Sequence, residues 1–350
     1  MQLRLLVAGA VVFLALAPLA RGAGGSGIRE LRVDGLVGGI VADGSRVAVN
    51  VYTGTDCDHI AVWSPISGER LAVRSSGYCS EGGESDLGAL AGTRVLWEDG
   101  IAGNLYTDYE DFTVDARTHL PPAGLYSYEY THDDSTGEDY GPTAGPFAGH
   151  GSLLVFASDL EHISGPDTSM RLWRVDGRHR TLIRAGAGLD FQSLSVDRNR
   201  IAGFVAGGEV LLLSGEGHTI RSFVPPVRLS PTVVLQGDDL ALEGRDTLYL
   251  YDTRTGRLKA QRVLPARSRF QDYSRGLVAL IRGNAFQILR VSDGKVVTIA
   301  RVYGPGLLGD YLQADLEPSG LFYTYSTQTD RAETGHVVFV PWKTLQRMVK

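Results

Sequence analysis

The chain lacks an excess of positive charge and the short motifs of several common enzyme classes. Its 34 Lys and Arg residues against 40 Asp and Glu give a net charge of −6, which argues against general binding of nucleic acids. It contains no Gly-x-Ser-x-Gly nucleophile turn, no His-Glu-x-x-His zinc helix and no P-loop. Hydrophobic residues make up 43% and charged residues 21%, so the composition excludes a long disordered chain and allows a real core.

The histidines do not indicate a metal site or a catalytic site either. None of the eight has a neighbour at a paired metal-ligand spacing. A catalytic site assembled from single residues on separate parts of a fold would leave no local motif. Enzymatic activity therefore stays open, although the sequence favours a protein without one.

Long apolar runs are also missing, apart from one at the start of the chain. Leu5 to Ala20 is an apolar run of 16 residues that follows Arg4 and precedes small residues. A membrane-spanning helix needs roughly 18 to 20 such residues. We therefore expect residues 1–22 to be a cleaved signal peptide and residues 23–350 to form one domain that is secreted or periplasmic, without a transmembrane segment after cleavage.

Cysteine occurs twice, as Cys57 and Cys79. Because disulfides persist in exported proteins, the simplest interpretation is one bridge between them, which would stabilise the fold by about 3 kcal/mol. Two free buried thiols, or a catalytic cysteine, remain the alternatives.

Short strands ended by polar turns recur along the chain, whereas a helical pattern occurs only near Lys343–Val349. Hairpin turns fall near Ser64, Asp115, Asp176, Ser214, Asp252, Ser292 and Pro341. A period near 40 residues with four short strands per unit predicts an all-β protein, a β-propeller with seven four-stranded blades. Six or eight blades stay open, because the second unit lacks a convincing outer strand and the last unit is ambiguous.

Two segments compete to close the ring. Ile28–Gly35 resembles the fourth-strand segments that precede each new unit, so it could complete the last blade from the N-terminal side. Thr344–Val349 could supply that strand instead. Either would hide the strand edge that an open ring exposes.

The turns in ADGSRVAV, VDRNRIAG and EPSGLFYT resemble the Pro-Asp-Gly turn of TolB-type, WD40-like propeller repeats. This likeness extends loosely over residues 28 to 345 and implies a propeller fold and export, but no function. No unit carries a Trp-Asp dipeptide. The segment YDTRTGRLKA also resembles the quinone-cofactor propeller repeat but lacks its closing Trp, so no cofactor is carried over.

The long connections between strands are expected to open on one face of units seven, one, two and three. They are residues 51–58, 74–86, 98–111, 119–146, 157–169 and 324–336. Together they hold 20 of the 40 acids, nine of the 15 tyrosines and only two of the 34 bases. Such a surface would attract cations or a basic partner, and tyrosine provides contact area at low entropy cost. The alternative is that these acidic loops serve only solvation.

The densest clusters in these connections are Tyr109–Phe112 and His132–Tyr140. We predict that the binding residues are Tyr106, Asp108, Tyr109, Glu110, Asp111, Tyr128, Tyr130, Asp133, Asp134, Glu138, Asp139 and Tyr140. Asp133, Asp134, Glu138 and Asp139 could also supply oxygen ligands for calcium, although their spacing does not match an EF-hand.

The sequence therefore favours an exported, non-catalytic binding or scaffold propeller that presents an acidic, tyrosine-rich loop face to a protein or a carbohydrate. One alternative is a metal-assisted propeller hydrolase or lyase that uses the same face. Another is a purely structural envelope protein. The oligomeric state stays open.

Overall fold

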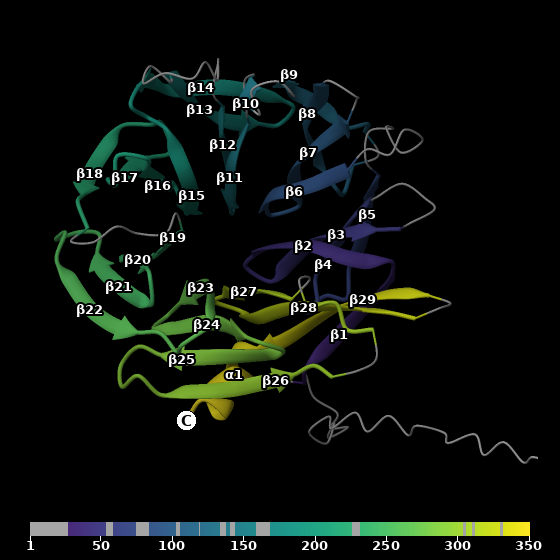
Figure 1. Cartoon of the computed structure of the whole chain (residues 1–350), viewed down its shortest axis with the longest axis vertical. Coiled ribbons are helices and arrows are strands. Elements are labelled where there is room, and N and C mark those ends of the chain that lie inside the picture. Colours follow the sequence, from purple (N-terminus) through teal and green to yellow (C-terminus); the bar gives the residue numbers. More distant parts are fainter. Residues whose placement is uncertain are drawn as a thin grey trace, which may run out of the picture.

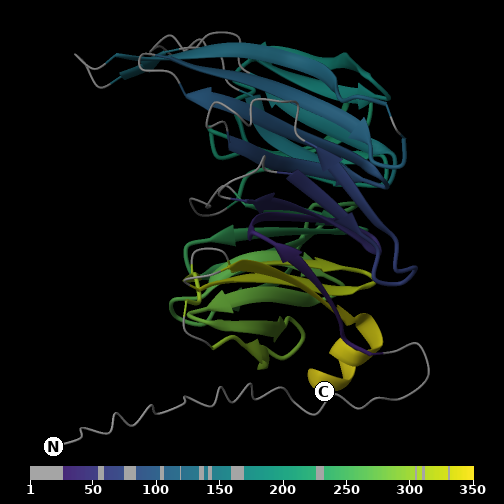
Figure 2. The same ribbon diagram turned by 90° about the vertical axis from the view of Figure 1, so that its right-hand side faces the viewer.

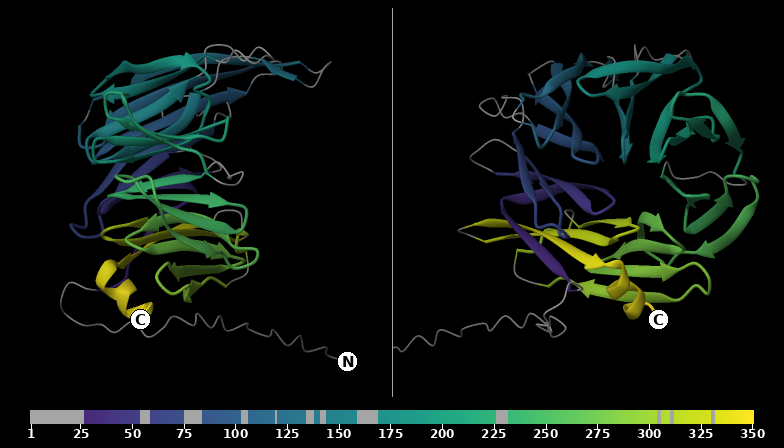
Figure 3. Two further views of the ribbon diagram at one scale, coloured as in Figure 1. Left: turned by 90° about the vertical axis from the view of Figure 1, so that its left-hand side faces the viewer. Right: turned by 180° about the vertical axis from the view of Figure 1, so that it is seen from behind.

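The chain forms a closed ring of seven antiparallel sheets around a central axis (Figures 1 and 3). A computed structural model describes residues 27–53, 59–74, 84–102, 106–118, 120–133, 138–140, 144–158, 169–225, 232–303, 306–309, 312–329 and 332–350. The predicted signal peptide and both cysteines lie outside these residues. The all-β, seven-bladed propeller is confirmed, with six blades of four strands and one of five.

Each blade follows the chain from an inner strand to an outer strand. Blade one contains β2 (Leu36–Asp43), β3 (Arg46–Tyr52), β4 (His59–Trp63) and β5 (Arg70–Arg74). Blade two contains β6 (Glu84–Ala91), β7 (Arg94–Ala102), β8 (Tyr106–Asp115), β9 (Ala123–Asp133) and β10 (Glu138–Tyr140). Blade three contains β11 (Ala144–His150), β12 (Leu153–Ser158), β13 (Ser169–Asp176) and β14 (His179–Ala187).

The same order repeats in the remaining blades. Blade four contains β15 (Phe191–Asp197), β16 (Arg200–Val205), β17 (Val210–Ser214) and β18 (Thr219–Phe223). Blade five contains β19 (Val233–Gln236), β20 (Asp239–Gly244), β21 (Thr247–Asp252) and β22 (Leu258–Val263). Blade six contains β23 (Arg269–Ser274), β24 (Leu277–Arg282), β25 (Ala285–Arg290) and β26 (Val296–Arg301). Blade seven contains β27 (Gln313–Glu317), β28 (Gly320–Gln328), β29 (Glu333–Pro341) and β1 (Arg29–Asp34).

The N-terminal strand closes the ring. β1 pairs antiparallel with β29, from Arg29 opposite Phe339 to Asp34 opposite Thr334. The prediction for Ile28–Gly35 is therefore confirmed. The competing prediction of a closing strand at Thr344–Val349 is wrong, because most of that segment lies in the helix α1 (Trp342–Met348). Leu345 of this helix is buried in the core between blades six and seven.

Within the described residues, the hydrophobic core is divided into seven clusters, each between two neighbouring blades. A sheet covered on both faces reads as a continuous apolar run, and all six residues of β12 are buried. Full burial of a side chain such as Phe156 contributes about 1.5–3 kcal/mol. The blades are therefore held together chiefly by the packing of one sheet on the next.

Polar contacts add specific links between blades at the inner strands. The Asp197 carboxylate at the end of β15 accepts a hydrogen bond of 2.8 Å from the Gly237 amide of blade five. Asp315 of blade seven accepts one of 2.8 Å from Ala42 of blade one. These carboxylates satisfy backbone donors that the inner strands would otherwise leave unpaired.

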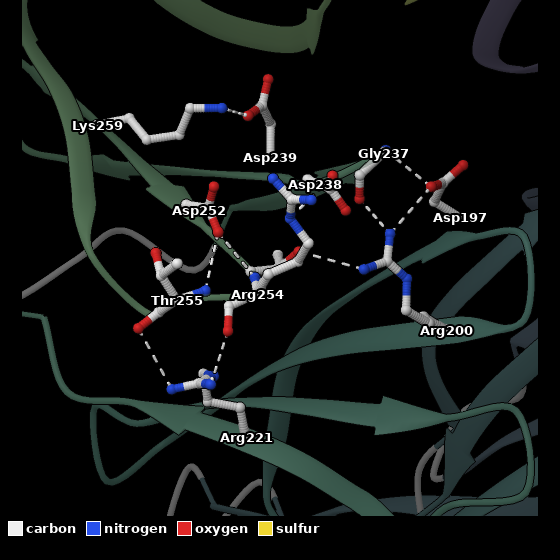
Figure 4. A network of polar contacts seen from close by, with 11 residues as sticks. Asp197, Arg200, Arg221, Gly237, Asp238, Asp239, Asp252, Arg254, Thr255 and Lys259 are labelled. Carbon is white, nitrogen blue, oxygen red and sulfur yellow. Dashed lines mark hydrogen bonds and ion pairs between the residues drawn. The ribbon is translucent and has the colours of Figure 1, made fainter.

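Arginines make a second set of links at the rim. Arg221 of β18 donates to the Arg254 carbonyl at 2.8 Å in the outer turn of blade five (Figure 4). Arg184 of β14 reaches the Gly217 carbonyl of blade four in the same way, at 3.0 Å. The ring is thus braced at its centre and at its rim, which gives a rigid support for whatever the blades carry.

Blade two departs from this plan and corrects the predicted loops. The segments 98–111 and 119–146 were expected as long connections, yet most of their described residues lie in strands β7 to β11. β9, with 11 residues, is the outer strand that the sequence did not reveal. Figure 2 and the left view of Figure 3 show the far end of blade two reaching beyond its neighbours. The alternation of Tyr and Thr with other residues in β8 and β9 is typical of a pleated strand. Their high content of Asp and Glu is more typical of a loop.

Candidate binding face on blade two

Strand pairing collects acids and tyrosines on the side of blade two that faces blade three. Glu98 of β7 lies opposite Asp111 of β8, which lies opposite Tyr126 of β9. One row further out, Tyr109 lies opposite Tyr128. Residues directly opposite each other project to the same side of a sheet, as do residues two apart in a strand. These five residues are called the blade-two face below.

The tyrosines of this face are ordered by ring contacts. Tyr109 and Tyr128 stack with their ring centroids 5.1 Å apart, and Tyr126 lies 5.6 Å from Tyr128. Gly100 lies opposite Tyr109, and a Cβ at that glycine would come within 2.8 Å of the Tyr109 ring. The absence of a side chain at Gly100 therefore allows Tyr109 to lie flat across the sheet.

Two carboxyl groups lie on the same side of the sheet as these rings, Glu98 partly buried and Asp111 fully buried. The Tyr128 hydroxyl donates to the Glu98 carboxylate at 2.5 Å, and Asp111 has no exposed surface. Burial raises the pKa of Glu98 to about 7, against the lowering effect of the Tyr128 hydrogen bond. Burial, and then the charge of Glu98, raise the pKa of Asp111 well above its usual value. Two neighbouring carboxyls that cannot both ionise cheaply retain a proton near neutral pH.

Blade three contributes a cation to the edge of this face. The Arg180 guanidinium of β14 lies 4.7 Å from the centre of the Tyr126 ring and 4.3 Å from the Trp173 ring. Cation–π contacts of this kind hold an aromatic ring in place. Tyr126 is thereby anchored between the two blades.

The opposite side of the same strands carries further acids. Asp99 is buried and lies opposite Glu110, and burial followed by the charge of Asp99 raises the pKa of Glu110. Asp108 is exposed on this side. The Glu110 carboxylate lies over Gly124 of β9, where a Cβ would come within 2.3 Å of its Oε1. A negative group therefore reaches across β9 toward the outer edge of the sheet.

The structure brings several predicted binding residues together and gives them different roles. Asp108 is exposed, and Tyr109 and Glu110 are partly exposed. Asp111 and Tyr128 are 0% and 8% exposed, so they support the face from beneath. For six further residues only the backbone position in β8, β9 or β10 is described: Tyr106, Tyr130, Asp133, Glu138, Asp139 and Tyr140. Asp134 lies outside the described residues, as do Cys57 and Cys79.

Sequence reasoning missed the central channel. The channel encloses a cavity of about 940 Å³ that is lined by the inner strands of the ring. Its lining residues include His150, Asp272, Asp315 and Glu317. Burial raises the pKa of Asp315 to about 6, and it raises the pKa of Asp272 and of Glu317 as well. Alternating polar residues in RFQDYS and QADLE were the available signal, but only ring closure shows that these segments are neighbours.

Among the residues that the structure describes, no group of three or more His, Cys, Asp or Glu residues is arranged to hold a metal ion. The side chains of the residues predicted as calcium ligands lie outside that part, so calcium binding remains a prediction. None of the described helices is long and apolar enough to cross a membrane.

Comparison with known proteins supports the fold. No protein-family model matches the chain, and no curated protein matches it. Among solved structures, the CNH domain of AfRom2 has a TM-score of 0.50 at 10% identity, covering 90% of this chain and 100% of that one. Raptor of Chaetomium thermophilum has a TM-score of 0.50 at 12% identity, covering 89% of this chain and 28% of that one. BamB from Moraxella catarrhalis has a TM-score of 0.45 at 12% identity, covering 87% and 86%. At such identities the likeness to the AfRom2 domain and to Raptor shows a shared fold alone.

Proposed function

We propose that this protein is an exported, non-catalytic binding or scaffold propeller that captures a protein partner on blade two. The observation that carries the proposal is the extension of β8, β9 and β10 beyond the ring (Figure 2). The sequences of these strands contain acids and tyrosines along their length. These three strands contain eight Asp and Glu residues and neither Lys nor Arg. A projecting surface of one charge sign draws a basic partner toward it.

Preorganisation supports this function. The stacked rings of Tyr109 and Tyr128 and the Arg180 contact hold the aromatic groups in place before any partner arrives. A surface that is already ordered loses little conformational entropy on binding. The braced ring carries that surface as a rigid support, which is the behaviour expected of a scaffold.

The test compares two exposed aspartates on different blades. Asp108 lies on blade two, and Asp246 lies in an exposed turn of blade five. Asp108→Lys and Asp246→Lys change the net charge equally, so the second is the matched control. The purified protein and both variants are used to capture partners from an extract of the producing cell's envelope.

We expect a protein that the parent and Asp246→Lys retain and that Asp108→Lys releases. Equal retention by all three would contradict binding on blade two. If a soluble polysaccharide elutes the captured protein, a carbohydrate replaces the protein as the proposed ligand. If the purified protein converts a substrate only when a divalent metal is present, the hydrolase or lyase alternative replaces the binding function.

A further inference from the structure

We infer that β9 receives an extended segment of the partner, rich in Lys and Arg, as an added strand of blade two. This inference rests on the proposed function and specifies the chemistry and geometry of the partner. Strand addition joins two proteins through main-chain hydrogen bonds, while alternate side chains determine which sequence fits.

The outer edge of blade two is only partly covered. β10 has three residues and pairs with Thr131, His132 and Asp133 at one end of the 11-residue β9. Among the described strands, none pairs with the outer side of β9 at Ala123–Leu125 or at Ser127–Tyr130. An open strand edge presents backbone N–H and C=O groups that a further strand can satisfy.

The other blades differ from blade two in charge at their edges: five are basic, and β1 of blade seven carries Glu30 and Asp34 beside its two arginines. Their outermost strands, β1, β5, β14, β18, β22 and β26, each carry Lys or Arg: Arg29, Arg32, Arg70, Arg74, Arg180, Arg184, Arg221, Lys259, Arg262 and Arg301. Several of these side chains are engaged with the next blade, as Arg184 and Arg221 are. Basic side chains on an edge strand repel a basic segment.

β9 and β10 carry Glu129, Asp133, Glu138 and Asp139, and no Lys or Arg. A basic segment therefore meets favourable charge on blade two, repulsion at the basic outer strands of blades one and three to six, and no net charge on β1 of blade seven.

Charge also argues against a second copy of this chain as the occupant. Two blade-two edges placed side by side would bring acids against acids, because β8, β9 and β10 contain no Lys or Arg. Like charges directly opposite each other destabilise a strand pair. The Glu110 carboxylate, which lies over Gly124 of β9, is instead within reach of a Lys or Arg on an added strand.

The test uses synthetic peptides and the full chain. The probe is an end-blocked, fluorescently labelled eight-residue peptide of alternating Arg and Val. Two further versions are N-methylated, one at every Arg and the other at every Val, and a fourth has Glu in place of Arg. N-methylation removes backbone donors on one edge of the peptide while keeping its charge, so it separates strand addition from simple attraction.

Fluorescence anisotropy should show binding of the Arg peptide, with at least about tenfold weaker binding of one N-methylated version. The Glu peptide should not bind. Hydrogen exchange of the β9 amides should slow when the Arg peptide is present. Glu110→Gln should weaken binding several-fold, whereas the control Asp246→Asn should leave it unchanged.

Equal affinity of the Arg peptide and both N-methylated versions would overturn strand addition, as would no binding by any peptide. If the peptides fail while Asp108→Lys still releases the captured partner, the proposed function stands without this inference. If Asp108→Lys also retains the partner, both fail.

Discussion

Replacing Glu98 by Gln should change how the stability of the protein depends on pH. Glu98 is partly buried beside Asp111 and Tyr128, and its pKa rises from 4.5 to about 7. The folded state therefore holds a proton that the unfolded chain releases above pH 4.5. This contribution to stability is fully present below pH 4.5 and is lost as the pH rises toward 7. A rise from 4.5 to about 7 corresponds to about 3 kcal/mol.

Gln has nearly the shape of protonated Glu, and its carbonyl oxygen can still accept the Tyr128 hydrogen bond. Glu98→Gln should therefore match the parent near pH 4.5 and exceed it by up to about 3 kcal/mol at pH 7.5. Buried carboxyls elsewhere, such as Asp315, titrate in both proteins, so the difference between the two reports the pair of Glu98 and Asp111.

The measurement is the free energy of unfolding by urea, followed by tryptophan fluorescence at intervals from pH 4.5 to 7.5. Asp246→Asn is the control, because it removes one exposed carboxylate on another blade. A Glu98→Gln variant that loses stability relative to the parent as the pH rises would refute the reasoning about the carboxyl pair.

Three further changes test the packing. Gly100→Ala should displace the Tyr109 ring and lower the midpoint of thermal unfolding, measured by differential scanning calorimetry. The control Gly207→Ala, which has open space around it, should leave that midpoint unchanged. Arg221→Met should cost about 1–2 kcal/mol in urea unfolding through its lost carbonyl contacts, against little change for the exposed Arg282→Met. Deleting residues 29–34 should open the ring and cause concentration-dependent aggregation in light scattering, while a chain beginning at Gly27 should stay monodisperse.

The sequence was sufficient to predict the propeller because its signals are local. Turns such as Asp43-Gly44 recur with the blade period, and the Ile28–Gly35 segment resembles an outer strand closely enough to identify the closure. β8 and β9 were mistaken for loops, since their acids are depleted in ordinary strands. Pairing with β7 and the stack of Tyr109 on Tyr128 outweigh that preference.

The arrangement of the candidate site could not be predicted from local sequence signals. Arg180 of blade three, whose charge acts on Asp111, follows it by 69 positions in the chain. Asp272 and Asp315 are 43 positions apart and become neighbours only where blades six and seven meet. Long-range packing of this kind leaves no spacing that one sequence can reveal.

Hydrogen exchange of the full chain, with and without its captured partner, tests binding on blade two most directly. We expect slower exchange of the amides in β8, β9 and β10, with little change in the inner strands β23 and β27 that line the channel. Protection confined to the channel strands, or to the outer strands of blades four to six, would contradict a binding surface on blade two.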